Sequence, residues 1–155
     1  YLDKPQTFKH LSKIKKYMKE IDKIALIKIE NGQILSTKSK GKNKYYIPGG
    51  KRENNETDQQ TLIREIQEEL SVEIINESIK YIGTFKAQSH GAIEGVIVKM
   101  TCYNADYIGE PKANNEIEEI KWLKYTDLDI ISEVDKIIFK HLKENGLLIW
   151  VEIEN

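Results

Sequence analysis

The sequence is poor in cysteine and contains no long apolar run. Cys102 is the single cysteine among 155 residues, which excludes an intramolecular disulfide and a zinc site built from four cysteines. No stretch approaches the roughly 20 apolar residues that a transmembrane helix needs, and the amino-terminal residues lack the apolar core of a secretory signal. We therefore expect a domain of the reducing cytoplasm that has no membrane partner.

An excess of charge of one sign is also missing. Lys and Arg (24) nearly balance Asp and Glu (25), so that the formal net charge is -1 at pH 7. Such a balance predicts no strong attraction to nucleic acid or anionic lipid. The lysine-rich segment 8–20 has the apolar spacing of an amphipathic helix. We interpret its lysines as a solvated face, because few aromatic side chains interleave with them as a nucleic-acid surface would require.

The length and the apolar pattern indicate one α/β domain over residues 1–155, large enough to bury its own core. Asn31-Gly32 is a strong signal for a tight turn between two strands. Ser132 is a candidate helix N-cap and Gly146 a helix stop. The pattern predicts strands over 24–30, 33–37, 45–47, 79–87, 94–105 and 117–124, and helices over 8–20, about 57–70 and 133–145. Helices thus bracket a strand-rich middle, which favours a mixed sheet.

The segment 50–72, GKRENNETDQQTLIREIQEELSV, concentrates acidic residues around one loop and one helix. Glu65, Glu68 and Glu69 are three and four positions apart, so a helix places them on one face. The apolar residues 62, 66 and 70 form a separate stripe that would face the core. Three carboxylates would therefore share one solvent-facing patch.

Carboxylates this close repel one another, by a few tenths of a kcal/mol for each pair on an exposed helix. A hard divalent cation such as Mg²⁺ relieves that repulsion, because it takes oxygen ligands and bridges carboxylates to substrate phosphates. The alternative is an ordinary solvated glutamate face paired with lysine or arginine. The fixed offsets from a Pro-Gly-Gly turn to Glu56, Arg64-Glu65 and Glu68-Glu69 favour a metal-assisted site.

This segment resembles the signature of the Nudix hydrolase family. The matching positions are Gly50, Glu56, Arg64, Glu65, Ile66, Glu68, Glu69 and Val72. Ser71 departs from the pattern, since the family usually has a glycine there to end the helix, and Asn55 replaces another common glycine. The resemblance implies the family's α/β/α sandwich with a mixed central sheet.

The resemblance also implies a role for each matching residue. Glu65, Glu68 and Glu69, with the carbonyl of Gly50, would bind Mg²⁺, with Mn²⁺ as an alternative ion. One further acid usually comes from a loop before a tryptophan-bearing strand, and Glu116 is our candidate. Arg64 would hold the glutamates by ion pairs, and Glu56 would support the loop. The catalytic group would then be Arg64, Glu65 and Glu69, with the general base left open between Glu65 and Glu116.

Substrate contacts are expected from residues near the signature loop. Lys51 and Arg52 follow the glycines and could meet phosphates. Tyr45 and Phe85 are candidates for contacting a base, and strand alternation sends only one of Tyr45 and Tyr46 toward the pocket. Core packing of the aromatic side chains and solvation of the two cations are the competing interpretations.

The function implied is hydrolysis of a diphosphate linkage in a nucleotide-type small molecule by a monomer or homodimer. Nucleoside triphosphates are favoured as substrates. An ADP-ribose or nucleotide-sugar diphosphatase and a catalytically silent nucleotide-binding module are the alternatives left open.

Overall fold

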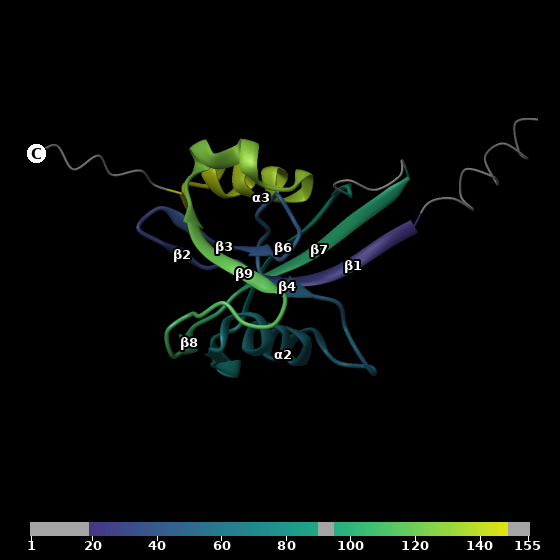
Figure 1. The fold of residues 1–155 in the computed structure, drawn as a ribbon, viewed down its shortest axis with the longest axis vertical. Helices are drawn as coiled ribbons and strands as arrows, with labels where there is room; N and C mark the ends of the chain where they lie inside the picture. The colour runs from purple at the N-terminus through teal and green to yellow at the C-terminus, as the bar shows by residue number, and fades with distance from the viewer. Residues whose placement is uncertain (1–18, 90–94, 149–155) are drawn as a thin grey trace, which may run out of the picture.

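The computed structural model describes residues 19–89 and 95–148 (Figure 1). Strands lie both before and after the helix of the signature, and another α-helix follows the last strand. In chain order the elements are β1 (Lys19–Leu26), β2 (Ile29–Glu30), β3 (Gln33–Ser39), β4 (Gly49–Gly50), α2 (Asp58–Leu70), β5 (Glu73–Ile74), η1 (Asn76–Ser78), β6 (Lys80–Gln88), β7 (Val96–Asn104), β8 (Tyr107–Ile108), β9 (Ile117–Leu123), η2 (Tyr125–Ile130) and α3 (Glu133–Glu144).

The central sheet is mixed. Its strand order is β4-β1-β7-β6, in which β1 and β7 run parallel while the other two pairings are antiparallel. Strands β2, β3 and β9 form a second, antiparallel sheet, and β5 pairs with β8. The pairing of β1 with β4 sets Ile24 opposite Gly50, which brings the glycine turn to the edge of the central sheet.

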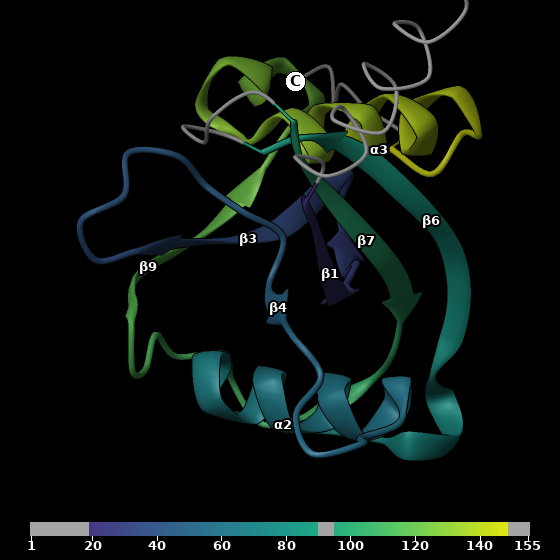
Figure 2. The same cartoon turned by 90° about the vertical axis from the view of Figure 1, so that its right-hand side faces the viewer.

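The helices cover opposite sides of the sheets (Figures 1 and 2). Side chains alternate along and just after β1, as a pleated strand requires. Ala25 and Ile27 belong to the core cluster that includes four residues of α3, whereas Ile24 and Leu26 belong to the cluster that includes three residues of α2. The fold is therefore an α/β/α sandwich, as the resemblance implied.

Helix α2 begins at a complete capping box. The side chain of Thr57 accepts a hydrogen bond from the N–H of Gln60, and the Gln60 side chain accepts one from the N–H of Thr57. The helix ends at Ser71, whose φ of 57° and ψ of 31° place it in the left-handed region. A serine thus adopts the helix-ending conformation for which the family usually has glycine.

Several boundaries differ from the sequence predictions. The predicted helix 8–20 is wrong at Lys19 and Glu20, which begin β1, and its other residues lie outside the described ranges, as does residue 94. Tyr45 and Tyr46 form isolated bridges and Ile47 forms none, while the strand lies in the Gly49–Gly50 pair. The predicted strand 24–30 is divided because β1 pairs in the central sheet, so that β2 and β3 alone form the hairpin. Long-range pairing overrides local strand propensity at these positions.

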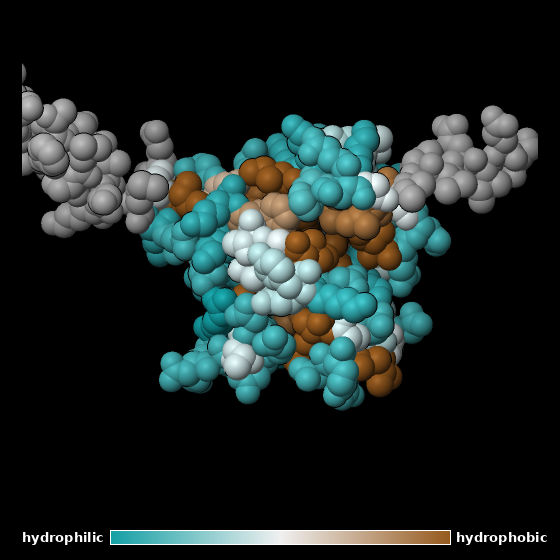
Figure 3. Space-filling model, turned by 180° about the vertical axis from the view of Figure 1, so that it is seen from behind, coloured by the Kyte–Doolittle hydropathy of each residue, from teal (hydrophilic) through white to brown (hydrophobic). Residues whose placement is uncertain are grey.

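Most of the surface seen from behind is hydrophilic, with hydrophobic residues showing through mid-face (Figure 3). Apolar side chains that reach the surface in small groups are normal for a folded domain. Within residues 19–89 and 95–148, no helix has the length and apolar character to cross a bilayer.

Candidate active site

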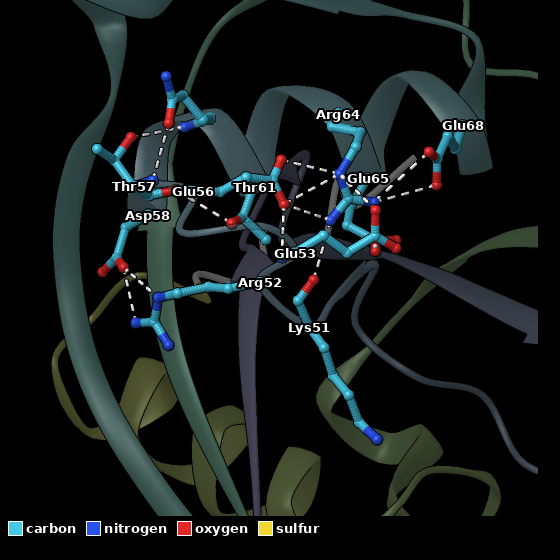
Figure 4. A network of polar contacts seen from close by, with 11 residues as sticks. Lys51, Arg52, Glu53, Glu56, Thr57, Asp58, Thr61, Arg64, Glu65 and Glu68 are labelled. Atoms are coloured by element: carbon cyan, nitrogen blue, oxygen red, sulfur yellow. Dashed lines mark hydrogen bonds and ion pairs between the residues drawn. The ribbon is translucent and has the colours of Figure 1, made fainter.

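Arg64 is the centre of the polar network between the signature loop and α2 (Figure 4). Its Nε and Nη2 donate to the carboxylate of Glu56 at 2.9 Å, and Nη2 also donates to the carbonyl of Lys51 at 2.9 Å. Its Nη1 donates to Glu65 at 2.9 Å and to Glu68 at 3.3 Å. These hydrogen bonds and ion pairs raise the pKa of Arg64 further above its ordinary value, with Glu56 contributing most. One guanidinium therefore fixes the loop to the acidic face of the helix.

Gly50 lies directly against the carboxylate of Glu65. A Cβ atom at Gly50 would come within 2.3 Å of Cδ of Glu65 and within 2.6 Å of both carboxylate oxygens. No side chain fits there, so glycine at this position lets the carboxylate approach the backbone. The Pro-Gly-Gly bend and the acidic helix thus form one surface.

Glu69 is the most buried acid on this surface, with 5% of its area exposed. Burial, with the neighbouring charges of Glu65 and Glu116, raises its pKa to about 8, although the backbone of Gly49 hydrogen-bonds to the carboxylate. Burial also raises the pKa of Glu65, opposed by Arg64. Glu69 is therefore repelled both by Glu65 of the same helix and by Glu116 from the loop before β9.

The donors suit a hard divalent cation, since all of them are carboxylate or carbonyl oxygens. Within the described part of the chain, no three acidic, histidine or cysteine side chains converge closely enough to form a finished metal site. Glu65 and Glu68 instead contact Arg64. The repulsion of Glu69 by Glu65 and Glu116 favours a cation at this surface. The donor chemistry therefore fits Mg²⁺, and side-chain rotation is needed to bring the ligands together.

A cavity of about 280 Å³ opens beside Glu69 and lies between the sheets and the start of α3. Glu69 and Glu116 both line it, so the further acid predicted before β9 lies at the same cavity as one acid of α2. Lys23 and Lys42 also line it and provide positive charge, and Tyr46 provides an aromatic ring. The cavity can thus hold an aromatic, partly anionic group next to the carboxylates.

The predicted substrate contacts lie elsewhere. Tyr45 is buried in the larger core cluster, and Phe85 packs against that cluster with its ring 5.1 Å from the ring of His141. Lys51 is exposed and lines a shallow cleft beside β1. Arg52 is bound to Asp22 and Asp58. None of these four side chains lines the cavity beside Glu69.

The sequence reasoning named neither Lys23 nor Lys42, and it left Tyr45 and Tyr46 as alternatives. Tyr46 bridges to Thr37, and Tyr46, not Tyr45, lines the cavity beside Glu69. Lys23 sits on β1 one position before Ile24. Nothing local to the sequence marks it, because only the pairing of β1 with β4 and β7 brings it to the cavity.

Known proteins resemble this chain in sequence. The family model described as NUDIX domain matches residues 21–142. An uncharacterized Nudix hydrolase, YvcI of Bacillus subtilis (strain 168), is 29% identical over 84 residues, which are 54% of this chain and 53% of that protein. The chain therefore spans about half the length of this relative.

Solved structures share the fold. The solution structure of the E. coli ORF135 protein has a TM-score of 0.65 and 23% identity, with 84% of this chain and 94% of that one covered. A MutT NUDIX hydrolase from Burkholderia pseudomallei has a TM-score of 0.63 and 21% identity, with 79% and 97% covered. At these identities the likeness concerns the fold alone.

Proposed function

Since this chain belongs to the Nudix family of hydrolases, which act on phosphorus-containing anhydrides, we propose that it cleaves the diphosphate linkage of a nucleotide with the help of Mg²⁺. One observation carries the proposal. Glu65 and Glu69 of α2 lie against the Gly49-Gly50 bend, next to a cavity that Glu116 also lines.

In this proposal Glu65, Glu68, Glu69 and Glu116, with the carbonyl of Gly50, hold Mg²⁺, and Mn²⁺ can replace it. The bound ion supplies charge neutralisation at phosphorus and lowers the pKa of the attacking water. Repulsion of the buried Glu69 by Glu65 and Glu116 supports this role, because a cation turns an unfavourable charge cluster into a favourable one.

The protein's own residues position the reaction and move the proton. Arg64 contacts Glu56, Glu65 and the carbonyl of Lys51, and so orients both the loop and the acids. A carboxylate oxygen of Glu65 or Glu116 accepts the proton of the attacking water, since both acids interact electrostatically with Glu69 at the cavity. Glu56 supports the loop through its bond from the Glu53 N–H, 2.7 Å long.

We place the nucleoside in the cavity, with Tyr46 near the base and Lys23 and Lys42 near anionic groups. At about 280 Å³ it lies near the lower end of ligand pockets, which span roughly 300–1,000 Å³. A single nucleoside suits this size better than the two moieties of ADP-ribose or a nucleotide sugar. Nucleoside triphosphates are thus the favoured substrates.

A cytoplasmic setting and a monomeric or homodimeric enzyme belong to the same proposal. The buried, unpaired thiol of Cys102 is compatible with a reducing compartment.

A panel of nucleotides with product analysis tests the proposal. Ordinary and oxidised nucleoside triphosphates, ADP-ribose and nucleotide sugars are incubated with Mg²⁺, Mn²⁺ or chelator, and the products are identified by mass spectrometry. We expect a nucleoside monophosphate and inorganic pyrophosphate from a nucleoside triphosphate, and only when a divalent ion is present. Turnover of ADP-ribose or a nucleotide sugar alone would change the substrate class, and no turnover of any substrate would favour a binding module.

A further inference from the structure

The loop between Gly50 and α2 is held at a second place, away from Arg64. Residues 51–57 are mostly exposed, and Asn54 and Asn55 adopt left-handed φ values of 44° and 62°. Such a loop carries little apolar packing of its own to define its path. Its position therefore depends on the side chains that tie it to the regular elements.

Arg52 supplies that tie through two carboxylates from different elements. Its Nε and Nη2 contact Oδ1 of Asp58 in the first turn of α2 at 2.8 and 2.7 Å, as Figure 4 shows. Its Nη1 contacts Oδ2 of Asp22 on β1. A guanidinium suits this bridge because its planar set of donors can bind two carboxylates at once.

The network continues into the central sheet. The hydroxyl of Tyr103, on β7, donates to Oδ2 of Asp58 at 2.5 Å. Although burial acts in the opposite direction, the hydrogen bonds from Tyr103 and Arg52 lower the pKa of Asp58. Loop, helix and two adjacent strands are thus joined through charged or polar contacts.

The contacts of Arg52 also constrain the backbone at Gly50. Asp22 lies two residues before Ile24, Ile24 pairs with Gly50, and Arg52 lies two residues after Gly50. The contact between Asp22 and Arg52 therefore closes a short ring that contains the Gly50 backbone. Gly50 is in turn packed against the Glu65 carboxylate.

We propose that Arg52 is a positioning residue that fixes the Gly50 backbone against the acidic face of α2, rather than a ligand for substrate phosphate. The role rests on the proposed function, because it acts through the cation site. Arg52 itself touches neither substrate nor metal. Its contribution is to keep the loop and the first turn of α2 in register with β1.

Removal of the Arg52 charge and loss of its positioning role should change the affinity for a divalent ion in opposite directions. Removing a cation near an acidic site should strengthen binding of a divalent ion if only Coulomb attraction matters. Losing the position of Gly50 should weaken it. A weaker Mn²⁺ affinity in Arg52→Ala therefore reports geometry.

The experiment uses the full chain with Arg52→Ala, Arg52→Lys and a matched control, Lys86→Ala. Lys86 forms an exposed ion pair with Glu20 of β1 at 3.0 Å, in the same sheet but outside the ring. Three quantities are measured: Mn²⁺ affinity by calorimetry, backbone hydrogen exchange of the peptide 49–58, and kcat and KM for a nucleoside triphosphate.

For Arg52→Ala we expect Mn²⁺ binding about tenfold weaker, faster exchange in 49–58 and kcat about tenfold lower with KM within twofold. Arg52→Lys should restore part of each, and Lys86→Ala should change none. A raised KM with unchanged Mn²⁺ affinity, or faster exchange with unchanged affinity and kcat, would overturn the proposal. If the unaltered chain neither binds Mn²⁺ nor hydrolyses nucleotides, the proposed function fails by itself, while unchanged exchange in Arg52→Ala would refute the ring separately.

Discussion

Within residues 19–89 and 95–148, helices α2 and α3 each bury one carboxylate, and the surroundings of the two acids differ. Both helices begin at a hydroxyl cap, Thr57 for α2 and Ser132 for α3. Glu69 on α2 is 5% exposed and Asp135 on α3 is 1% exposed. Glu69 interacts with two further acids and lines a cavity. Asp135 instead accepts a hydrogen bond from the backbone N–H of Ile47 at 3.0 Å.

We propose that Glu69 serves the chemistry of the site and that Asp135 serves the fold. Burial raises the pKa of Asp135 to about 7, opposed by the Ile47 N–H, Ser132 and Lys23. Its other oxygen has no hydrogen-bond partner among the described residues. A proton can relieve that cost, because the neutral acid needs no counter-charge. Glu69 lies among like charges, where a divalent cation gives the larger relief.

The largest expected effect is on turnover. Glu69→Gln, and equally Glu65→Gln, should lower metal-dependent hydrolysis about a thousandfold or more, because each removes a charged oxygen donor from the site. Asp135→Asn should stay within about threefold, since Asp135 itself does not line the cavity. Initial rates with saturating Mg²⁺ measure this, and circular dichroism checks the fold. Near-normal rates in either glutamate variant would refute the assignment.

The next largest effect is a dependence of protein stability on pH that comes from Asp135. Its pKa is about 7 in the fold and 3.8 for the free side chain, so the folded state binds the extra proton and stability falls as pH rises from about 4 to about 7. Asn cannot ionise and still offers an oxygen to the Ile47 N–H. Relative to Asp135→Asn, the unaltered chain should lose roughly 3 kcal/mol of unfolding free energy across that window, at 1.36 kcal/mol per pKa unit.

Urea unfolding at several pH values measures the difference between the two proteins. The difference should level off above pH 7, where both folded and unfolded Asp135 are ionised. A difference that is constant from pH 4 to 7 would show that Asp135 titrates normally in the fold.

Metal binding near Glu69 on α2 should stabilise the folded protein. Mn²⁺ at about 100 times its dissociation constant should raise the unfolding free energy by about 2.7 kcal/mol. The rise should vanish in Glu69→Gln and persist in Asp135→Asn. Thermal melts with Mn²⁺ or chelator record the effect, and equal rises in all three proteins would place the ion outside the acidic face.

The smallest expected effect is a gain in stability from a substitution at the carboxyl-terminal end of α2, compared with the same end of α3. Ser71 holds a left-handed φ of 57° at the end of α2, whereas the end of α3 already has Gly146 at a φ of 70°. Ser71→Gly should therefore stabilise the protein by about 1 kcal/mol. Asn145→Gly serves as the control, because Asn145 has a φ of −93°. Chemical unfolding measures the stability of both variants. An equal gain in stability from Asn145→Gly would contradict this account.

The local features of α2 could be predicted from the sequence, and the long-range ones could not. The spacing of Glu65, Glu68 and Glu69 is set by helical geometry alone, and Gly50 and Glu116 were predicted from the resemblance. The partner of Arg52 could not be predicted, because Asp22 lies 30 residues away and becomes adjacent only when β1 pairs with β4.

Long-range pairing also determines which aromatic residue lies at the cavity. Alternation predicts that one of Tyr45 and Tyr46 faces a pocket, but the bridges of Tyr45 to Ile131 and of Tyr46 to Thr37 decide which. These partners come from distant parts of the chain, and strand propensity carries no information about them. The position of Lys23 on the cavity depends on the same kind of pairing.

An anomalous difference map from a crystal soaked in Mn²⁺ tests the central claim most directly. The account predicts a peak bounded by Glu65, Glu69 and the carbonyl of Gly50, with no peak at Asp135. A peak at another surface, or an occupied ion that contacts none of these three residues, would contradict it.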